Sequence, residues 1–135
     1  MSAFVKFNSF VEAVAEKAHN LGSDQLVIAL TNTAPSAANT QLSDLTEITY
    51  TNLSSRNVTT TSSAQTSGTY KLVLADLVLT ASGAVGPFRY AIVYNSTSAG
   101  SLLIGYYDYG SSISLATGET LTVDLDQTNG FLQLA

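Results

Sequence analysis

The chain has 135 residues, a formal net charge of −5 at pH 7 and no cysteine. This length suits one domain with a sizeable core, and the lack of cysteine excludes a scaffold held by disulfides. The five basic residues are too few and too scattered for a nucleic-acid-binding patch. Charged residues make up only 11% of the chain, and Ser, Thr, Asn and Gln take their place, which is typical of an uncharged β-rich surface.

No stretch of the sequence approaches the roughly 20 apolar residues of a membrane-spanning helix. The N-terminal segment MSAFVKFNSF also lacks the apolar core of a secretion signal. We therefore expect synthesis in a cytoplasm, with neither nucleic acid nor a membrane as a partner.

The first predicted element is an amphipathic helix from about Ser9 to Asn20. Ser9 and Glu12 have the spacing of a capping box, and Gly22 stands where a left-handed residue would end the helix. His19 lies off the apolar stripe, so we expect it in solvent near the helix end. The stripe itself repeats every three or four residues and consists of Phe7, Phe10, Val11, Val14, Ala18 and Leu21.

From residue 25 onward the pattern changes to that of β-strands. The run QLVIALT at 25–31 is continuously apolar, which is typical of a strand buried on both faces. The segment LTEITYTNL at 45–53 alternates, and predicts a strand with Ile48 and Tyr50 facing inward. Residues 54–68 contain almost no large apolar side chains, so we expect either an exposed strand or a mobile loop there.

The second half contains denser strand signals. Leu72 and Leu74 alternate in one phase and Leu77 and Leu79 in the other, which predicts a bulge or bend near Asp76. The segment FRYAIVY is predicted as a strand that joins SLLIGYYDYG through a hairpin connection, NSTSAG. Its alternation places four aromatic and aliphatic residues on one face: Phe88, Tyr90, Ile92 and Tyr94.

Short strands separated by glycine-containing turns continue to the C-terminus. The sequence therefore predicts a mainly β fold, an antiparallel β-sandwich or jelly-roll-like domain with one N-terminal amphipathic helix. We expect one domain over 1–135, with an N-terminal arm and helix over 1–22 and the β-sandwich over 25–135.

Three tyrosines crowd around Asp108 in the segment YYDYG. On a regular strand, Tyr106 shares a face with Leu102, Ile104 and Asp108, whereas Tyr107 and Tyr109 lie on the opposite face. The tyrosines are therefore interpreted as strand packing, with a protein interface and a small-ligand site as alternatives. Gly105 among these rings predicts the close approach of a neighbouring backbone or of a large ring.

No catalytic, cofactor-binding or metal-binding motif stands out, so we expect no enzyme and no cofactor. His19 is the only histidine, and one histidine without cysteine does not form a typical zinc site. Asp124 and Asp126 resemble part of a calcium loop, but the spacing of an EF-hand is missing. A strand-end calcium site stays open there, beside the simpler interpretation of a solvated acidic strand face.

Several segments together resemble small structural proteins of tailed bacteriophages. They are LVIALTNTAP, DLTEI, FRYAIVYN, LIGYYDYGSS and GETLTVD, and the resemblance covers almost the whole chain, with 54–68 as its weakest part. It implies a non-enzymatic virion protein of the capsid decoration or head auxiliary type, located on the capsid surface and made in the host bacterial cytoplasm. It also implies the major capsid protein as partner and a cyclic homo-oligomer, for example a trimer.

Two interface hypotheses follow from this resemblance. Phe4 and Phe7, expected to be exposed ahead of the helix, are candidates for docking to the capsid, and Tyr106, Tyr107 and Tyr109 are candidates for a subunit contact. The alternative function is a tail, fibre or spike module that binds a host-surface glycan through these tyrosines. That alternative predicts exposed rings gathered on one patch.

Overall fold

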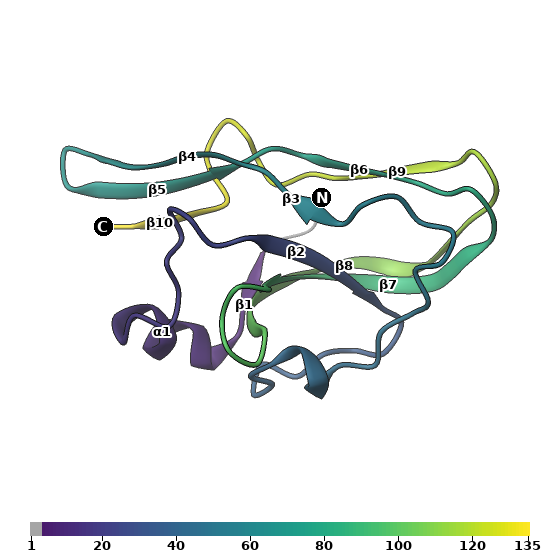
Figure 1. Cartoon of the computed structure of the whole chain (residues 1–135), viewed down its shortest axis with the longest axis horizontal. Helices are drawn as coiled ribbons and strands as arrows, with labels where there is room; N and C mark the ends of the chain where they lie inside the picture. Colours follow the sequence, from purple (N-terminus) through teal and green to yellow (C-terminus); the bar gives the residue numbers. More distant parts are fainter. Residues whose placement is uncertain (1–3) are drawn as a thin grey trace.

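The computed structural model describes residues 4–135, which form two packed β layers with one helix beside them (Figure 1). One layer is a five-stranded sheet in the order β1-β8-β7-β2-β3. The other contains a three-stranded sheet, β10-β5-β4, and a two-stranded sheet, β6-β9. All strand pairs are antiparallel, so the predicted mainly β, sandwich-like fold is confirmed.

The helices and strands have the following bounds: β1 Val5–Lys6, α1 Asn8–Ala15, β2 Leu26–Thr31, the 3-10 helix η1 Leu42–Asp44, β3 Asn57–Val58, β4 Thr60–Thr66, β5 Thr69–Leu74, β6 Leu77–Thr80, β7 Val85–Asn95, β8 Leu102–Leu115, β9 Thr120–Val123 and β10 Leu132–Leu134. Neither helix in residues 4–135 has the length and apolar character needed to cross a bilayer.

The five-stranded sheet is covered by apolar side chains on both faces. Leu26, Ile28 and Leu30 of β2 point into the core between the two layers, while Val27 and Ala29 join a second cluster. The segment 32–45, which carries η1, lies across the outer face of this sheet and packs on that second cluster through Leu42 and Leu45 (Figure 1). Because every residue of β2 is buried, the prediction of a strand covered on both faces is confirmed.

Helix α1 is shorter than the sequence predicts, and its caps differ. Lys17 adopts a left-handed conformation, with φ of 67°, directly after the last helical turn. The N–H of Ala18 then donates to the carbonyl of Ala13 at 2.8 Å, a bond that closes the helix end. Ser9 makes no cap because the helix begins one residue earlier, and no side chain of the described residues caps its N-terminus. The predicted capping box and the predicted stop at Gly22 are therefore wrong.

The predicted strand at 45–53 is also wrong. The Tyr50 hydroxyl accepts the N–H of Leu30 at 2.9 Å, and the Arg56 guanidinium donates to the carbonyl of Ile28 at 2.7 Å. The same guanidinium lies over the Tyr50 ring, 3.6 Å from its centroid. Side chains thus take up polar groups of β2 that a neighbouring strand would otherwise pair. Ile48 and Tyr50 still pack against the inter-layer core, as expected.

Two changes of phase decide which side chains face the core. The break predicted near Asp76 is confirmed, because β5 ends at Leu74 and β6 begins at Leu77. A second, unpredicted irregularity lies between Phe88 and Tyr90 on β7. Phe88 therefore joins the inter-layer core, whereas Tyr90 lies in the outer cluster, and the prediction of one shared face is wrong for Phe88. Residues 54–68 contain the exposed strand β4.

Candidate functional site

The three tyrosines of β8 lie on two faces of the sheet. Tyr106 packs in the outer cluster with the Phe7 ring, at 5.4 Å between centroids, whereas Tyr107 and Tyr109 contact the inter-layer core. The sequence predicted this split between two faces, but it did not predict which aliphatic side chains share a face with each tyrosine. A bulge at Ile104 shifts the register between β7 and β8, so Leu103 accompanies Tyr106 and Ile104 accompanies Tyr107.

The environment of these rings is that of packed side chains. Tyr107 is buried, and burial raises the pKa of its hydroxyl to about 12. Burial raises the pKa of Tyr109 to about 12 as well, and its hydroxyl finds no hydrogen-bond partner among the described residues. Asp108 accepts two hydrogen bonds from Arg89, at 2.7 and 3.1 Å, and these bonds lower the pKa of its carboxyl. The rings do not form the single exposed patch that glycan stacking would use.

The two phenylalanines of the N-terminal arm are not an exposed pair. Phe7 is fully buried, because β1 pairs with β8 and the N–H of Phe7 donates to the carbonyl of Ile104 at 3.1 Å. The expectation that Phe7 is exposed is therefore wrong. Phe4 is half-buried and packs edge-on against Phe131, with centroids 4.7 Å apart.

His19 is buried, which corrects its predicted place in solvent. Its Nδ1 lies 2.9 Å from the side-chain nitrogen of Asn95, and that nitrogen also donates to Asp24 at 2.7 Å. The Asn95 oxygen accepts backbone N–H groups, which fixes the amide nitrogen toward His19. Nδ1 is then an acceptor and the imidazole is neutral. Burial lowers the pKa of His19, and the Asp24 charge opposes this shift.

The acidic residues near the C-terminus organise a turn. The Asp124 carboxylate accepts the N–H of Asp126 at 2.9 Å, and Asp126 in turn accepts two hydrogen bonds from Asn129. The bonds from Asn129 lower the pKa of the Asp126 carboxyl. Within residues 4–135, no group of three or more His, Cys, Asp or Glu side chains is arranged to hold a metal ion.

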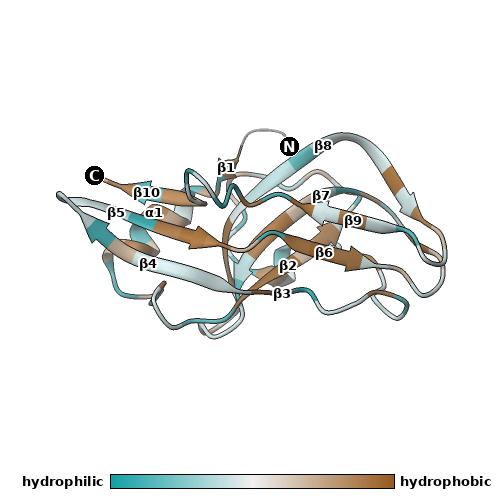
Figure 2. Ribbon diagram, turned by 90° about the horizontal axis from the view of Figure 1, so that it is seen from above, coloured by the Kyte–Doolittle hydropathy of each residue, from teal (hydrophilic) through white to brown (hydrophobic). Residues whose placement is uncertain are grey.

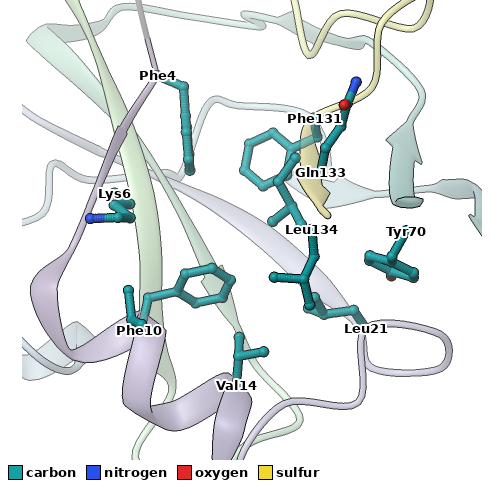
Figure 3. A pocket seen from close by; sticks show the side chains of 11 residues that line it. Phe4, Lys6, Phe10, Val14, Leu21, Tyr70, Phe131, Gln133 and Leu134 are labelled. Atoms are coloured by element: carbon teal, nitrogen blue, oxygen red, sulfur yellow. The ribbon is translucent and has the colours of Figure 1, made fainter. Parts of the chain in front are cut away.

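The most distinct concave surface is an apolar groove between α1 and β10, which we call the α1–β10 groove (Figure 3). It has a volume of about 410 Å³. Its walls come from four separate parts of the chain, namely the arm, the helix region, β5 and the C-terminal strand. Representative side chains are Phe4, Phe10, Val14, Tyr70, Phe131 and Leu134.

The groove is open to solvent and almost free of charge. Val11 and Leu134 at its mouth are 55% and 61% exposed, which is unusual for large apolar side chains. Among the described residues, Lys6 is the one charged member of the lining, and its amine points away from the other side chains (Figure 3). Such a surface can bury the apolar side chains of a partner.

Sequence reasoning missed this groove because its walls are far apart in the chain. Two features of the sequence indicate an apolar surface of this kind, namely Val11 and the segment FLQLA. Both place large apolar side chains on short elements that have few neighbours to bury them.

Comparison with known proteins finds no family model, no curated protein and no solved structure that matches the chain.

Proposed function

We propose that the protein is a non-enzymatic structural component of a bacteriophage virion, a decoration protein that binds the assembled capsid and stabilises it. The sequence resemblance supports this class of function. The structural observation that carries the proposal is the α1–β10 groove, an open apolar surface with exposed Val11 and Leu134. Its occupant on the virion is an apolar segment of the major capsid protein.

Charge favours docking at this groove. The chain has a net charge of −5, yet no carboxylate side chain of residues 4–135 lines the groove. An apolar segment can therefore enter without removing a carboxylate from water, a step that costs several kcal/mol per ion. A protein that binds only the assembled shell then stabilises that shell by its binding free energy.

The docking role first assigned to Phe4 and Phe7 changes accordingly. Phe4 forms part of the groove wall, whereas Phe7 belongs to the core. A deletion of residues 1–7 would remove Phe7 and β1, and would therefore test folding as much as docking. A substitution at the groove mouth is the sharper experiment.

Val11→Gln is expected to weaken saturable binding to expanded capsids by roughly tenfold, because it places a polar group in the apolar contact. Val78→Gln is the matched control, since Val78 on β6 is 53% exposed and does not line the groove. Binding is measured by co-sedimentation of each purified variant with the particles. Unchanged binding of the Val11 variant, or equal losses for both variants, would contradict the proposed docking groove.

Labelling of intact virions with gold-conjugated antibody tests the location independently. Regular label over the head is expected for a decoration protein. Label confined to the tail would overturn this proposal and would favour the tail, fibre or spike module as the function.

A further inference from the structure

Strand β4 forms an edge of the three-stranded sheet, and beyond the irregularity at Thr61 it lacks the usual protection of an edge strand. Its order in the sheet is β10-β5-β4, so one side of β4 pairs with β5 and the other side pairs with no strand in residues 4–135. Natural edge strands commonly carry Lys, Pro or inward-pointing charges that prevent further pairing. Residues 60–66, TTSSAQT, contain none of these. Figure 2 shows β4 at the rim of the molecule, mostly pale in hydropathy.

The hairpin turn determines which backbone groups point to the open side of β4. Ser67 and Gly68 form a two-residue turn with φ of 52° and 84°, flanked by the pair Thr66 and Thr69. Residues that flank such a turn exchange both hydrogen bonds, and the pairs then alternate along the ladder. Ser63 and Gln65 consequently point their N–H and C=O groups away from β5.

A hydrogen bond on the other side of β5 confirms this alternation. Leu72 is the partner of Ser63, and its carbonyl accepts the N–H of Phe131 at 2.7 Å. Leu72 therefore directs its backbone groups to the β10 side and not toward β4. Only Thr61, the unpaired residue of the irregularity at the start of β4, departs from the regular ladder.

We propose that a second copy of this chain pairs with β4 in antiparallel orientation, about a two-fold axis at Ala64. Ser63 of one copy then lies opposite Gln65 of the other, and each outward N–H meets an outward carbonyl. The two three-stranded sheets become one continuous sheet across the dimer. Because both copies use the same strand, the contact closes on itself and does not propagate into fibres.

The distribution of charge makes β4 the place where a second copy can approach. The chain has a net charge of −5, so two copies repel each other over most of their surfaces. Residues 57–70 carry no charged side chain, and Lys71, opposite Ala64, lies on the next strand inward. The side chain that meets itself on the axis is that of Ala64, which is small enough for the close spacing of this pair.

A cysteine substitution tests the predicted register, since the chain contains no cysteine. Ala64→Cys places two thiols across the axis at a Cα separation of about 4.5 Å, which a disulfide can span. Thr66→Cys on the same strand is the control, because Thr66 lies opposite Ser62 of the partner. Mild oxidation followed by non-reducing electrophoresis is expected to give a covalent dimer for the first variant only. No dimer, or equal dimer from both variants, would overturn the proposal.

A second pair of variants tests the backbone contact without any cross-link. Gln65→Pro removes an N–H that points to the open side and leaves the pairing with β5 intact, so it should weaken dimerisation by roughly tenfold or more. Gln65→Ala is the control, because both substitutions lose the bond from the Gly68 N–H to the Gln65 side chain. Dimerisation is measured by sedimentation equilibrium. A monomer at all concentrations, or a dimer that the proline substitution leaves unchanged, would contradict the inference, whatever the result of the capsid-binding experiment.

Discussion

Gly105 is the residue on which the packing of the N-terminal arm depends. A Cβ added at this position would overlap the ring of Phe4 and would approach the carbonyl of Val5 to 2.8 Å. The Phe4 ring lies between this glycine and Phe131, and so connects β8 to the C-terminal strand. A glycine here lets the arm lie directly on the sheet.

Gly105→Ala is therefore expected to lower the free energy of unfolding by about 1–3 kcal/mol, because the arm has to move or the Phe4 ring has to leave its site. Gly22→Ala is the control, since its added Cβ would make only ordinary contacts, the nearest at 3.5 Å. Its effect should stay within about 0.5 kcal/mol. Urea unfolding of both variants measures the difference. Equal effects would show that Gly105 is not a point of close contact.

The structural roles of single residues differ in how well the sequence predicts them. The role of Gly105 could be predicted, because a glycine among large rings on a strand commonly marks a close approach. The bulge at Ile104 was not predicted, because alternation along a strand assumes a constant period and the neighbouring Gly105 is equally compatible with a close approach in a regular strand. His19 was misplaced for a related reason. Its predicted exposure assumed that the helix continues, whereas the chain leaves the helix after Ala15.

At the scale of elements, a buried hydrogen-bond cluster joins the chain after α1 to the β7–β8 connection. Asn95 is fully buried and contacts both His19 and Asp24. The neutral imidazole fits this cluster, because Nδ1 accepts from Asn95. A protonated imidazole would place an N–H against the Asn95 amide, and would also bring a charge into a site where burial already lowers the pKa of His19.

Stability should therefore fall as the pH decreases below about 6.5, the ordinary pKa of histidine. In this range His19 binds a proton in the unfolded chain but not in the folded chain. The loss of stability continues until the pH reaches the lower pKa of His19 in the folded state. Its slope is at most about 1.4 kcal/mol per pH unit. Urea unfolding between pH 7 and pH 4.5 measures it, above the range in which Asp44, Asp108 and Asp126, whose pKa values are lowered, become protonated.

His19→Asn provides the control for this pH dependence. Asparagine keeps an acceptor for the Asn95 amide but does not titrate, so the variant should lose most of the slope between pH 7 and 4.5 even if its stability is lower throughout. A slope that persists in the variant would assign the pH dependence to other groups.

Elements were predictable where burial alone decides them. The run 25–31 had to be a strand covered on both faces, because from Leu26 onward it contains no polar side chain for an exposed face until Thr31. The segment 45–53 has an equally good alternating pattern, but the side chains of Tyr50 and Arg56 bind the edge of β2 beside single backbone bonds from Ile48 and Arg56, and no regular ladder forms. Whether such a segment pairs as a strand or binds through its side chains depends on tertiary contacts, which a local sequence pattern does not contain.

At the scale of the whole molecule, the strands at the centre are deeply buried, whereas those at the periphery are exposed to solvent. Figure 1 shows the five-stranded sheet between the other β layer and the segment at 32–45, whereas the β4–β5 hairpin extends away from this centre. All six residues of β2 are buried, and all seven of β4 are at least partly exposed. The α1–β10 groove lies where the two layers are not closed over each other. No single stretch of sequence predicts this groove, because its shape depends on where the strands of both layers end.

This gradient of burial predicts a gradient of local stability that amide hydrogen exchange can measure. Amides of β2 are expected to exchange only through global unfolding, because opening this strand exposes both apolar clusters. The inward amides of β4, such as those of Ser62 and Ala64, should exchange through opening of the hairpin, which exposes little apolar surface. Low denaturant concentrations should therefore accelerate exchange in β2 but hardly affect β4. Measurements at high dilution keep pairing between copies from protecting β4. Equal protection and equal denaturant dependence of the two strands would instead mean that the hairpin unfolds only together with the sandwich.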